Sequence, residues 1–507
     1  MHVQCDMFSD LFSTVCWIFC SALNVWTILA LLAVSFYQWW KKPHRSFPPG
    51  PRGLPIIGVL PWLGGDPQKV LFDWGQKYGP VMSVRMAGVD TVFLNTYDAI
   101  NTAFVKQGDI FSGRAALRLV RDILGNNGLV LTDYGDKQLS QKRFAMKTLR
   151  KLGMGKPEME NIINEEMCHF ANYLETKVGK PIDLALGYDN MTGNVICVTA
   201  FGRRFDYDDP QLKHIFQLLQ NQYVADESLL ILLFHFHDYI HFIPPFKAVK
   251  ERFTKTEHAI LDAMQTIIDE HKKNFQPDCI RDYIDAFLYE QKYGQEKKYF
   301  TETQLRVTCR DLFEAGTETT STTLAWLFLG LLNYPEYHKH IVAEVDQILG
   351  SSSNPTMAHR SSMPVTCAFI QEVMRYCPIV PNSVGHKTTK DTELYGFTLP
   401  KGTNVMPNIY AAHFDPLTWP NPHEFNPGRH IDQDGKFLYS PKIIPFSLGK
   451  RACLGESLAR MEVFLMFVGI LQKFTITSGT SNLPSLTEGR LGFLYTTKPY
   501  KVILELR

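Results

Sequence analysis

A single cysteine between two glycines carries the strongest chemical signal in the sequence. Cys453 lies in the run Phe446-Ser-Leu-Gly-Lys-Arg-Ala-Cys-Leu-Gly455, in which Gly449 and Gly455 allow the backbone to approach a bulky group. Arg451 adds a permanent positive charge suited to a carboxylate, and Phe446 adds an aromatic face. With no second Cys or His nearby, the run does not predict a zinc or iron–sulfur site. It predicts a haem held by one thiolate, with Arg451 on a haem propionate.

A buried apolar role is the common alternative for any free cysteine. The pattern Phe-x-x-Gly-x-Arg-x-Cys-x-Gly, however, fixes five residue types around Cys453, which favours the ligand. The sequence has no Cys-x-x-Cys-His run, so the haem is expected to be held without covalent links.

A second chemical signal lies in the middle of the long helix expected over Thr303–Leu332. The run Ala315-Gly-Thr-Glu-Thr-Thr320 places a glycine and several hydroxyl side chains there, although Gly costs about 1 kcal/mol relative to Ala. Hydroxyl groups in a helix can bond to the preceding turn and bend it. A groove opened in this way would accept a diatomic ligand, with Glu318 and Thr319 handling protons. A polar notch in a packed helix explains the residues equally well.

A third signal is the sequence Glu372-Val-Met-Arg375, which puts a carboxylate and a guanidinium on one face of a helix. Such pairs are common on protein surfaces and contribute only a few tenths of a kcal/mol. Arg429, in Phe425-Asn-Pro-Gly-Arg-His430, is a candidate third partner. A buried Glu with two Arg would be structural and would stabilise the core beside the haem.

The bulk composition narrows the class of protein. The chain has 507 residues, 45% of them hydrophobic, and a net charge of +1, which argues against nucleic acid as a partner. Its ten cysteines are scattered without a Cys-x-x-Cys pair, which is typical of reduced thiols that face the cytosol.

The elements that position these residues begin with an apolar N-terminal segment. Residues 11–40 carry no charge, and the run Leu11–Tyr37 is long enough to span a bilayer core of about 30 Å. Lys41, Lys42 and Arg45 follow it, which places the rest of the chain in the cytosol. A buried core helix is the alternative.

The proline-rich run Phe47–Pro55 stiffens the chain after this segment. We therefore expect a luminal tail and transmembrane anchor over 1–42, a hinge over 43–58 and a catalytic domain over 59–507. The run would fix the catalytic domain against the membrane, or serve as an ordinary linker.

The rest of the chain has mainly helical periodicity. Apolar residues recur at three-to-four spacing in Glu158–Thr176, Thr254–Asn274 and Thr303–Leu332. Val81–Met86, Thr91–Leu94 and Leu399–Val405 are typical of short strands. The expected fold class is mainly α, with small β-sheets.

Together these features resemble a cytochrome P450 of the microsomal family-2 type. The resemblance covers essentially the whole chain and implies the P450 fold with an N-terminal transmembrane helix. It includes three further strings: Phe111-Ser-Gly-Arg114, Asn194-Val-Ile-Cys197 with Phe201-Gly-Arg-Arg-Phe-Asp206, and Asp282-Tyr-Ile-Asp-Ala-Phe287.

The resemblance implies a role for each motif. The cofactor would be non-covalent haem b, with Cys453 as its proximal thiolate and electron donor. Glu318 and Thr319 match the acid–alcohol pair that delivers protons to oxygen. The remaining matches are positions that hold the haem propionates, at Arg114, His386 and Arg451, and a structural triad at Glu372, Arg375 and Arg429.

One departure from the family concerns the helix over a propionate. The family usually has Trp-x-x-x-Arg there, whereas this chain has Gln138 and Lys142. Both side chains can hydrogen-bond a carboxylate, but Lys lacks the planar fork of Arg. Haem retention or redox tuning is therefore expected to be weaker.

The implied reaction is mixed-function oxidation, in which R–H, O2, two electrons and two protons give R–OH and water. The chain shows no flavin-binding motif, so electrons must come from NADPH–cytochrome reductase, with cytochrome b5 as a second donor. A basic stripe would dock the acidic reductase or would simply be a solvated helix face: Lys137, Lys142, Arg143, Lys147, Arg150 and Lys151. The implied location is the endoplasmic reticulum membrane.

The resemblance implies an apolar substrate, and fatty acids, steroids and xenobiotics all stay open. Five stretches would form the pocket walls: Leu117–Leu131, Leu229–Phe242, Leu312–Thr319, Ile379–Val384 and Leu491–Leu494. His235, His237 and His241 suggest a metal site, but neutral or interfacial histidines are the simpler interpretation.

Two other functions were considered for the same motifs. A haem-thiolate isomerase or dehydratase would use no O2, and the intact Glu318–Thr319 pair argues against it. A non-enzymatic membrane haem protein, a sensor or carrier, gains slight support from Gln138 and Lys142.

Overall fold

The computed structural model describes residues 25–27, 29–31, 33–34, 36–37 and 44–507, except 116, 225–226 and 351–352. Side chains within helices are described except at 220–229, 231, 235 and 239. Most of the predicted anchor over 1–42, including the run Leu11–Tyr37, lies outside the described residues. Within the part of the chain that the structure describes, no helix has both the length and the apolar composition needed to cross a membrane.

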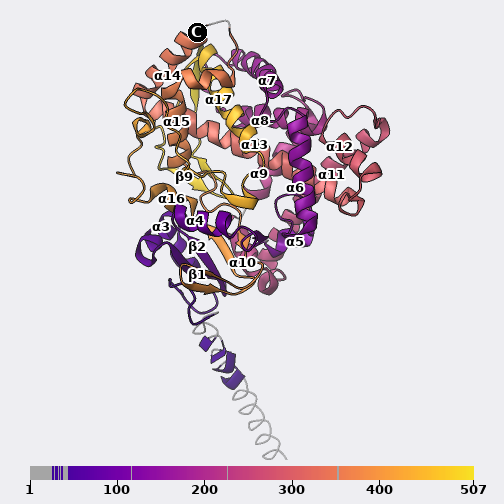
Figure 1. Cartoon of the computed structure of the whole chain (residues 1–507), viewed down its shortest axis with the longest axis vertical. Coiled ribbons are helices and arrows are strands. Elements are labelled where there is room, and N and C mark those ends of the chain that lie inside the picture. Colours follow the sequence, from indigo (N-terminus) through magenta and orange to yellow (C-terminus); the bar gives the residue numbers. More distant parts are fainter. Residues whose placement is uncertain are drawn as a thin grey trace, which may run out of the picture.

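Helices form most of the molecule, which confirms the expected mainly α class with small sheets (Figure 1). The helices of the first half are α2 (Leu60–Leu63), α3 (Pro67–Tyr78), α4 (Tyr97–Asn101), α5 (Arg118–Leu124), α6 (Asp136–Lys151), α7 (Pro157–Glu175), α8 (Ala185–Phe201), α9 (Pro210–Val224) and α10 (Glu227–Ile240). Those of the second half are α11 (Pro244–Asn274), α12 (Tyr283–Tyr293), α13 (Glu302–Asn333), α14 (Pro335–Ile348), α15 (Pro364–Tyr376), α16 (Ile409–Phe414) and α17 (Glu456–Lys473).

The longest of the described helices, α13, runs through the middle of the helical body (Figure 1). The Thr301 hydroxyl accepts a hydrogen bond from the Gln304 N–H at 3.2 Å and caps its first turn. Pro335 starts α14 one residue after Tyr334 ends α13, because proline is favoured in a first helical turn. The helix predicted over Thr303–Leu332 is confirmed, and its 32 residues span about 48 Å.

A five-stranded sheet lies beside the helices in the order β1–β2–β7–β4–β3, and only β2 and β7 are parallel. Its strands are β1 (Val81–Met86), β2 (Val89–Leu94), β3 (Gly113–Arg114), β4 (His386–Lys387) and β7 (Asn404–Pro407). The register pairs Arg114 directly with His386, which lies 272 positions later in the chain. The sheet thus joins two of the predicted propionate residues.

Three two-stranded sheets complete the β structure, and one of them corrects an expected strand. Their strands are β5 (Thr392–Leu394) with β6 (Phe397–Leu399), β8 (Phe474–Ser478) with β11 (Val502–Leu506), and β9 (Gly489–Leu491) with β10 (Tyr495–Thr497). The single strand expected over Leu399–Val405 is wrong, because the chain turns between β6 and β7. Gly402 has a positive φ of 86°, and the Thr403 N–H bonds to the Pro400 carbonyl at 3.2 Å.

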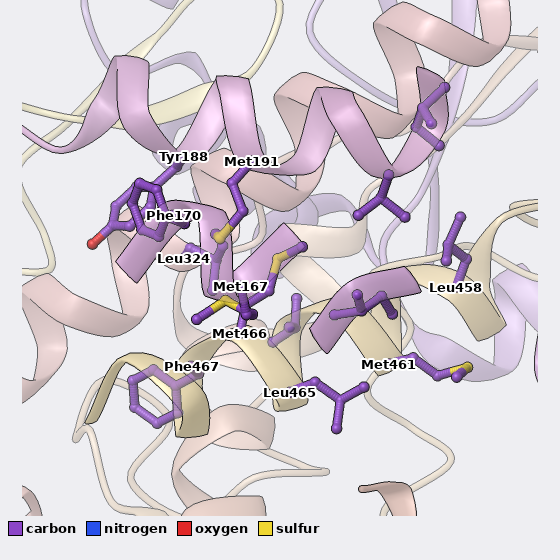
Figure 2. Close-up of a cluster of buried hydrophobic side chains, with 14 of the residues drawn as sticks. Met167, Phe170, Tyr188, Met191, Leu324, Leu458, Met461, Leu465, Met466 and Phe467 are labelled. Carbon is purple, nitrogen blue, oxygen red and sulfur yellow. The ribbon is translucent and has the colours of Figure 1, made fainter. Parts of the chain in front are cut away.

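The main core lies where α7, α8, α13 and α17 meet (Figure 2). Met167 and Phe170 of α7 pack near Tyr188 and Met191 of α8, and the Phe464–Val468 stretch of α17 is buried on all sides. A helix that is apolar all round is a buried helix. Because α17 begins three residues after Cys453, this core fixes the position of the cysteine loop.

Candidate active site

A cavity of about 360 Å³ lies between α13 and the cysteine loop. Four of the five predicted walls contribute apolar lining, through Leu129, Val130, Leu312, Ile379, Val380, Val384, Phe493 and Leu494. The fifth expected wall, Leu229–Phe242, contributes none of its described residues. Leu230 and Leu233 of this segment pack instead against Leu119 of α5 and Phe253 of α11.

The cysteine loop is held in a strained and closely packed conformation. The Cys453 N–H donates to the Phe446 carbonyl at 2.9 Å, and Ser447 has a positive φ of 59°. Gly449 has a φ of 79°, and a Cβ there would lie 1.9 Å from the Phe104 carbonyl oxygen. Only glycine fits at this position, which explains why the motif requires it.

The Cys453 side chain faces the cavity together with Phe446, Arg451 and Gly455. The thiol is accessible from the cavity, yet the surrounding protein buries it, and this burial raises the pKa of the Cys453 thiol. Hydrogen bonds from the backbone N–H groups of Gly455 and Glu456 lower the pKa of Cys453 and so partly offset the effect of burial. The nearest atom to a Cβ built on Gly455 would be the Cys453 sulfur, at 4.0 Å, so glycine keeps the space beside the sulfur open.

Two buried arginines lie on the cavity wall with no carboxylate bound to either guanidinium. Arg114 donates to the carbonyls of Val130 at 2.9 Å and Val384 at 3.3 Å. Arg451 donates to the carbonyls of Ser112 at 2.9 Å and Thr132 at 2.6 Å, and its Nη1 has no hydrogen-bond partner in the structure.

The electrostatics of these arginines fit an anionic group. Burial lowers the pKa of Arg114 to about 9, with Arg451 as a second cause, and burial lowers the pKa of Arg451 to about 10. A buried cation is stabilised by an anion beside it. The thiol of Cys453 and the guanidinium groups of Arg114 and Arg451, which bind no carboxylate of the described residues, lie around one cavity. This arrangement fits a haem, with the thiol toward its iron and the two guanidinium groups toward its propionates.

Gln138 and Lys142 of α6 also line the cavity. Gln138 is buried, and the Lys142 ammonium donates to the Lys450 carbonyl in the cysteine loop. Burial lowers the pKa of Lys142, and the charges of Arg451 and Arg114 add to the effect. Gln138 and Lys142, which replace the usual Trp and Arg, thus lie where a carboxylate of the haem would be bound.

His386 does not line the cavity. Its Nδ1 bonds to the Phe111 carbonyl at 2.7 Å, and its ring stacks on Phe104 with centroids 3.9 Å apart. Burial, and then the charge of Arg114, lower the pKa of His386 well below its usual value, so the ring is neutral. His386 positions β3 and Arg114 in this structure.

The predicted groove on α13 faces the cavity. Glu318 and Thr319 both line it, and the Thr319 hydroxyl donates to the Ala315 carbonyl at 2.7 Å. A Cβ on Gly316 would lie 2.5 Å from atoms of Ile196, so this glycine also permits the close approach of α8. Burial raises the pKa of Glu318 to about 8, and the charges of Glu314 and Asp189 add to this effect. The Glu318 carboxyl therefore holds its proton at neutral pH.

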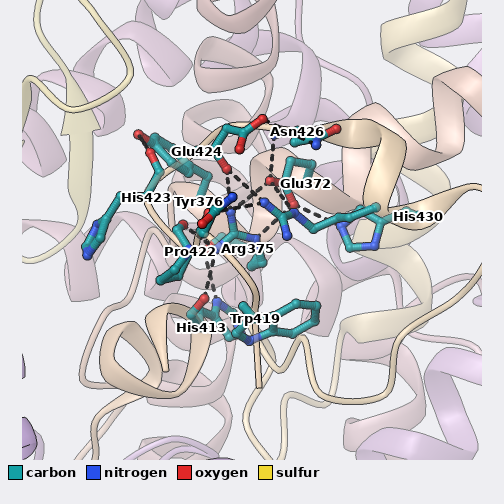
Figure 3. Close-up of polar contacts among 12 residues, drawn as sticks. Glu372, Arg375, Tyr376, His413, Trp419, Pro422, His423, Glu424, Asn426 and His430 are labelled. Atoms are coloured by element: carbon teal, nitrogen blue, oxygen red, sulfur yellow. Dashed lines mark hydrogen bonds and ion pairs between the residues drawn. The ribbon is translucent and has the colours of Figure 1, made fainter. Parts of the chain in front are cut away.

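Glu372 and Arg375 lie in one buried network (Figure 3), and Arg429 joins it through an ion pair with Glu372. Arg375 donates to both Glu372 oxygens, at 2.8 and 2.7 Å, and the Arg429 Nε lies 3.1 Å from Glu372 Oε1. His430, which the sequence reasoning missed, lies 2.9 Å from Glu372 Oε2. Burial alone would raise the pKa of Glu372, but the bonds from Arg375 and His430 outweigh it and lower the value to about 2.

This network extends to the cysteine loop through His413. The His413 Nδ1 bonds to the Arg375 carbonyl at 3.2 Å, and its Nε2 accepts the Ile444 N–H at 2.8 Å. Burial, with the charge of Arg375, lowers the pKa of His413 to about 3 and keeps the ring neutral. Ile444 lies two residues before Phe446, so the network supports the loop and makes no contact with the cavity through Glu372 or Arg375.

Several charged residues of the site carried no sequence signal. Glu462 of α17 lines the cavity, accepts the Thr320 hydroxyl at 3.1 Å and has a pKa that burial raises to about 8. Arg310, Asp311 and Glu314 of α13 line it as well. Glu462 is one of several charged residues of α17, so nothing in the sequence set it apart.

The predicted basic stripe divides into two parts. Lys137 bonds to the carbonyl of Asn126 at 2.8 Å, and Lys142 points into the cavity region, so neither belongs to an outer docking face. The other four residues of the stripe, with Lys156 in addition, line an open groove over α6 and the start of α7. We call this the basic groove: Arg143, Lys147, Arg150, Lys151 and Lys156.

A metal ion at the histidines of α10 finds no support. The ring of His237 stacks on that of His241 with centroids 5.0 Å apart, and the His235 side chain lies outside the described residues. Among the residues that the structure describes, His271, Asp282 and Asp285 alone place three potential ligand atoms within 4.8 Å of one another. Arg281 binds both Asp285 oxygens, at 2.6 and 2.8 Å, so this group is an ion-pair network.

Comparison with known proteins agrees with this geometry. The family model described as Cytochrome P450 matches residues 48–504. The chain is 36% identical to cytochrome P450 2J3 of Rattus norvegicus, over 89% of this chain and 91% of that protein. It is 32% identical to cytochrome P450 2U1 of Bos taurus, over 95% and 93%, and 36% identical to cytochrome P450 2B2 of Rattus norvegicus, over 86% and 89%.

Proposed function

The chain belongs to the cytochrome P450 family, and from this we propose that it inserts one oxygen atom of O2 into an apolar small molecule at the cavity beside Cys453. As a family member it is a monooxygenase that binds haem b through a cysteine thiolate. The observation that supports the finer proposal is the Glu318–Thr319 pair, which lines the same cavity as Cys453. The intact pair argues against an isomerase or a dehydratase that uses no O2.

The haem, when bound, activates dioxygen, and the protein residues orient the substrate and supply protons. Cys453 would hold the haem iron through its sulfur, which requires the thiol to give up the proton that burial holds on it. Arg114 and Arg451, with Gln138 and Lys142 beside them, would bind the propionates. Phe446, Gly449 and Gly455 would shape the loop, and His386 would position Arg114.

Glu318 and Thr319 would deliver the two protons that the reaction consumes. Glu318 holds a proton at neutral pH because burial raises its pKa to about 8. The Thr319 hydroxyl, now bonded to the Ala315 carbonyl, would rotate to donate toward the cavity. The triad of Glu372, Arg375 and Arg429 would act structurally.

Electrons would come from NADPH through a separate flavoprotein reductase, with cytochrome b5 as a second donor. The basic groove gives an acidic partner a complementary surface on the α6 side of the molecule. We place the protein in the endoplasmic reticulum membrane, with an anchor over 1–42, a hinge over 43–58 and a cytosolic catalytic domain over 59–507. Fatty acids, steroids and xenobiotics are the substrate classes to test.

The reduced carbon monoxide spectrum tests this function. The wild-type protein should show the red-shifted Soret band of a thiolate-bound haem, and Cys453→Ala should lose it. Cys367→Ala is the matched control, because Cys367 is buried outside the cavity. With reductase and NADPH, Thr319→Ala should keep the band but consume oxygen with less product. A well-folded wild-type preparation without the band would refute the proposal.

A further inference from the structure

Part of the chain between α5 and α6, Gly128–Thr132, lies directly against α13, and we call it the linking segment. Gly128 has a positive φ of 85°. A Cβ at this position would lie 2.8 Å from Val307 Cγ1 and closer still to the Asp311 carboxylate. Only glycine therefore allows the linking segment to approach α13 this closely.

Two side chains of α13 hold the backbone of the linking segment. Gln304 Oε1 accepts the Gly128 N–H at 3.2 Å, and its Nε2 donates to the Gly128 carbonyl at 3.0 Å. Asp311 Oδ2 accepts the N–H groups of Leu129 at 2.8 Å and Val130 at 3.1 Å. Gln304 is fully buried, and a buried polar group left without its partner is costly, so these bonds fix the segment on the helix.

Carbonyls of the same segment accept hydrogen bonds from both buried arginines of the cavity wall. Arg114 Nε donates to the Val130 carbonyl at 2.9 Å, and Arg451 Nη2 donates to the Thr132 carbonyl at 2.6 Å. Val130 thus bonds to α13 through its N–H and to Arg114 through its carbonyl. The linking segment therefore connects α13 to the two guanidinium groups of the proposed propionate site.

The placement of these two arginines carries particular weight in this chain. Gln138 and Lys142 replace the usual Trp and Arg of the helix over a propionate, so fewer strong donors share the task. A guanidinium binds a carboxylate well only when its fork is correctly oriented. Whatever orients Arg114 and Arg451 should thus influence how firmly the haem is held.

We propose that Gln304 is a positioning residue for the haem, which through the linking segment fixes Arg114 and Arg451 where they bind the propionates. This inference rests on the proposed haem site and adds to it a residue that lies outside the cavity wall. The Gln304 amide carries no charge. Its removal can therefore change the electrostatic field at the haem only by moving other groups.

Gln304→Leu tests the proposal on the haem-loaded full-length protein, because leucine is similar in size and cannot bond to Gly128. Haem transfer to apomyoglobin should become about fivefold faster, as expected for the loss of about one neutral hydrogen bond. The reduction potential of the haem iron should fall, because poorly placed guanidinium groups compensate less of the propionate charge. A uniform loss of stability would speed the transfer but would not move the potential.

Asn194→Leu is the matched control, because Asn194 holds a backbone segment in the same way at a place remote from the arginines. Its amide bonds to the N–H and the carbonyl of Phe205, each at 2.9 Å, and Asn194 is fully buried and does not line the cavity. This variant should leave the potential unchanged. An unchanged potential or transfer rate in Gln304→Leu, or the same fall in potential in Asn194→Leu, would overturn the inference.

Should Gln304→Leu not fold, Thr132→Val takes its place, because the Thr132 hydroxyl donates to the Gly128 carbonyl at 2.7 Å within the linking segment. This variant must show the same fall in potential, and an unchanged potential overturns the inference. A missing thiolate Soret band in the wild type would instead remove the proposed function itself.

Discussion

The ammonium group of Lys142 donates a hydrogen bond to the backbone carbonyl of Lys450, and this bond ties α6 to the loop that carries Cys453. The same side chain lines the cavity close enough to Arg114 and Arg451 for their charges to lower its pKa. One ammonium group therefore has both a loop carbonyl and the proposed propionate site within its reach.

Lys142→Arg should retain haem better than the wild type. The planar guanidinium can bind a carboxylate through two parallel N–H groups, which the ammonium cannot. We expect the rate of haem transfer to apomyoglobin to fall about fivefold, which corresponds to about 1 kcal/mol. Lys147→Arg is the matched control on the exposed side of α6 and should change nothing. Equal or faster haem loss from Lys142→Arg would contradict the assignment.

Because of Glu318, product formation should fall at alkaline pH. Its pKa is raised to about 8, so the carboxyl is protonated at neutral pH and loses its proton as the pH rises through that value. Product formed per NADPH should therefore fall between about pH 7 and 9 in the wild type. Glu318→Gln should give less product at every pH and should lose this dependence. A variant that keeps the wild-type pH profile would show that another group supplies the proton.

Glu372→Ala should destabilise the protein by about 3–5 kcal/mol, because it leaves the fully buried Arg375 without its carboxylate. The folded pKa of Glu372 is lowered from 4.5 to about 2, so its stabilisation is complete above 4.5 and is lost as the pH falls toward 2. Urea unfolding between pH 7 and 3 measures both effects. The exposed Glu393 provides the control, and Glu393→Ala should stay within about 0.5 kcal/mol.

Charge reversal in the basic groove should weaken reductase binding. Lys147→Glu with Arg150→Glu should raise the reductase concentration needed for half-maximal rate about tenfold at low salt, and the difference should shrink at high salt. Lys247→Glu with Lys255→Glu reverses two exposed charges of α11 outside that groove. If both double variants respond alike, net charge and not the basic groove governs association.

The sequence predicted elements best where the local pattern was strong. The helix expected over Glu158–Thr176 is α7, Pro157–Glu175, and the strand Val81–Met86 is found with its full bounds. The helix expected from Thr254 begins ten residues earlier, at Pro244. The Pro244-Pro245 pair resembles a helix breaker, yet proline is tolerated in a first turn. The prediction of one strand over Leu399–Val405 was wrong because Pro400 and Gly402, which the pattern ignored, make a turn.

In the candidate site too, the residues of local motifs were predicted and their partners from distant segments were not. Cys453, Glu318 and Glu372 belong to short motifs whose residues are close in the chain. The pattern favoured the haem ligand at Cys453, whereas the resemblance to the family supplied the roles of Glu318 and Glu372. His430 reaches Glu372 across 58 positions, and Glu257 reaches Arg310 across 53, so only the packing of separate helices brings these partners together. Lys142 was expected both on an outer stripe and beside a propionate, and the structure places it on the cavity wall.

Because α13 is continuous, the number of residues between Arg310 and Thr319 is itself a constraint on how this protein can diverge. One residue inserted between them would rotate everything beyond it by about 100° and would turn either the Glu318–Thr319 pair or Arg310 away from the cavity. Deletion of one residue would rotate the helix beyond it by the same angle in the opposite sense. Substitutions on α13 preserve this spacing, whereas a change in the length of the helix breaks it.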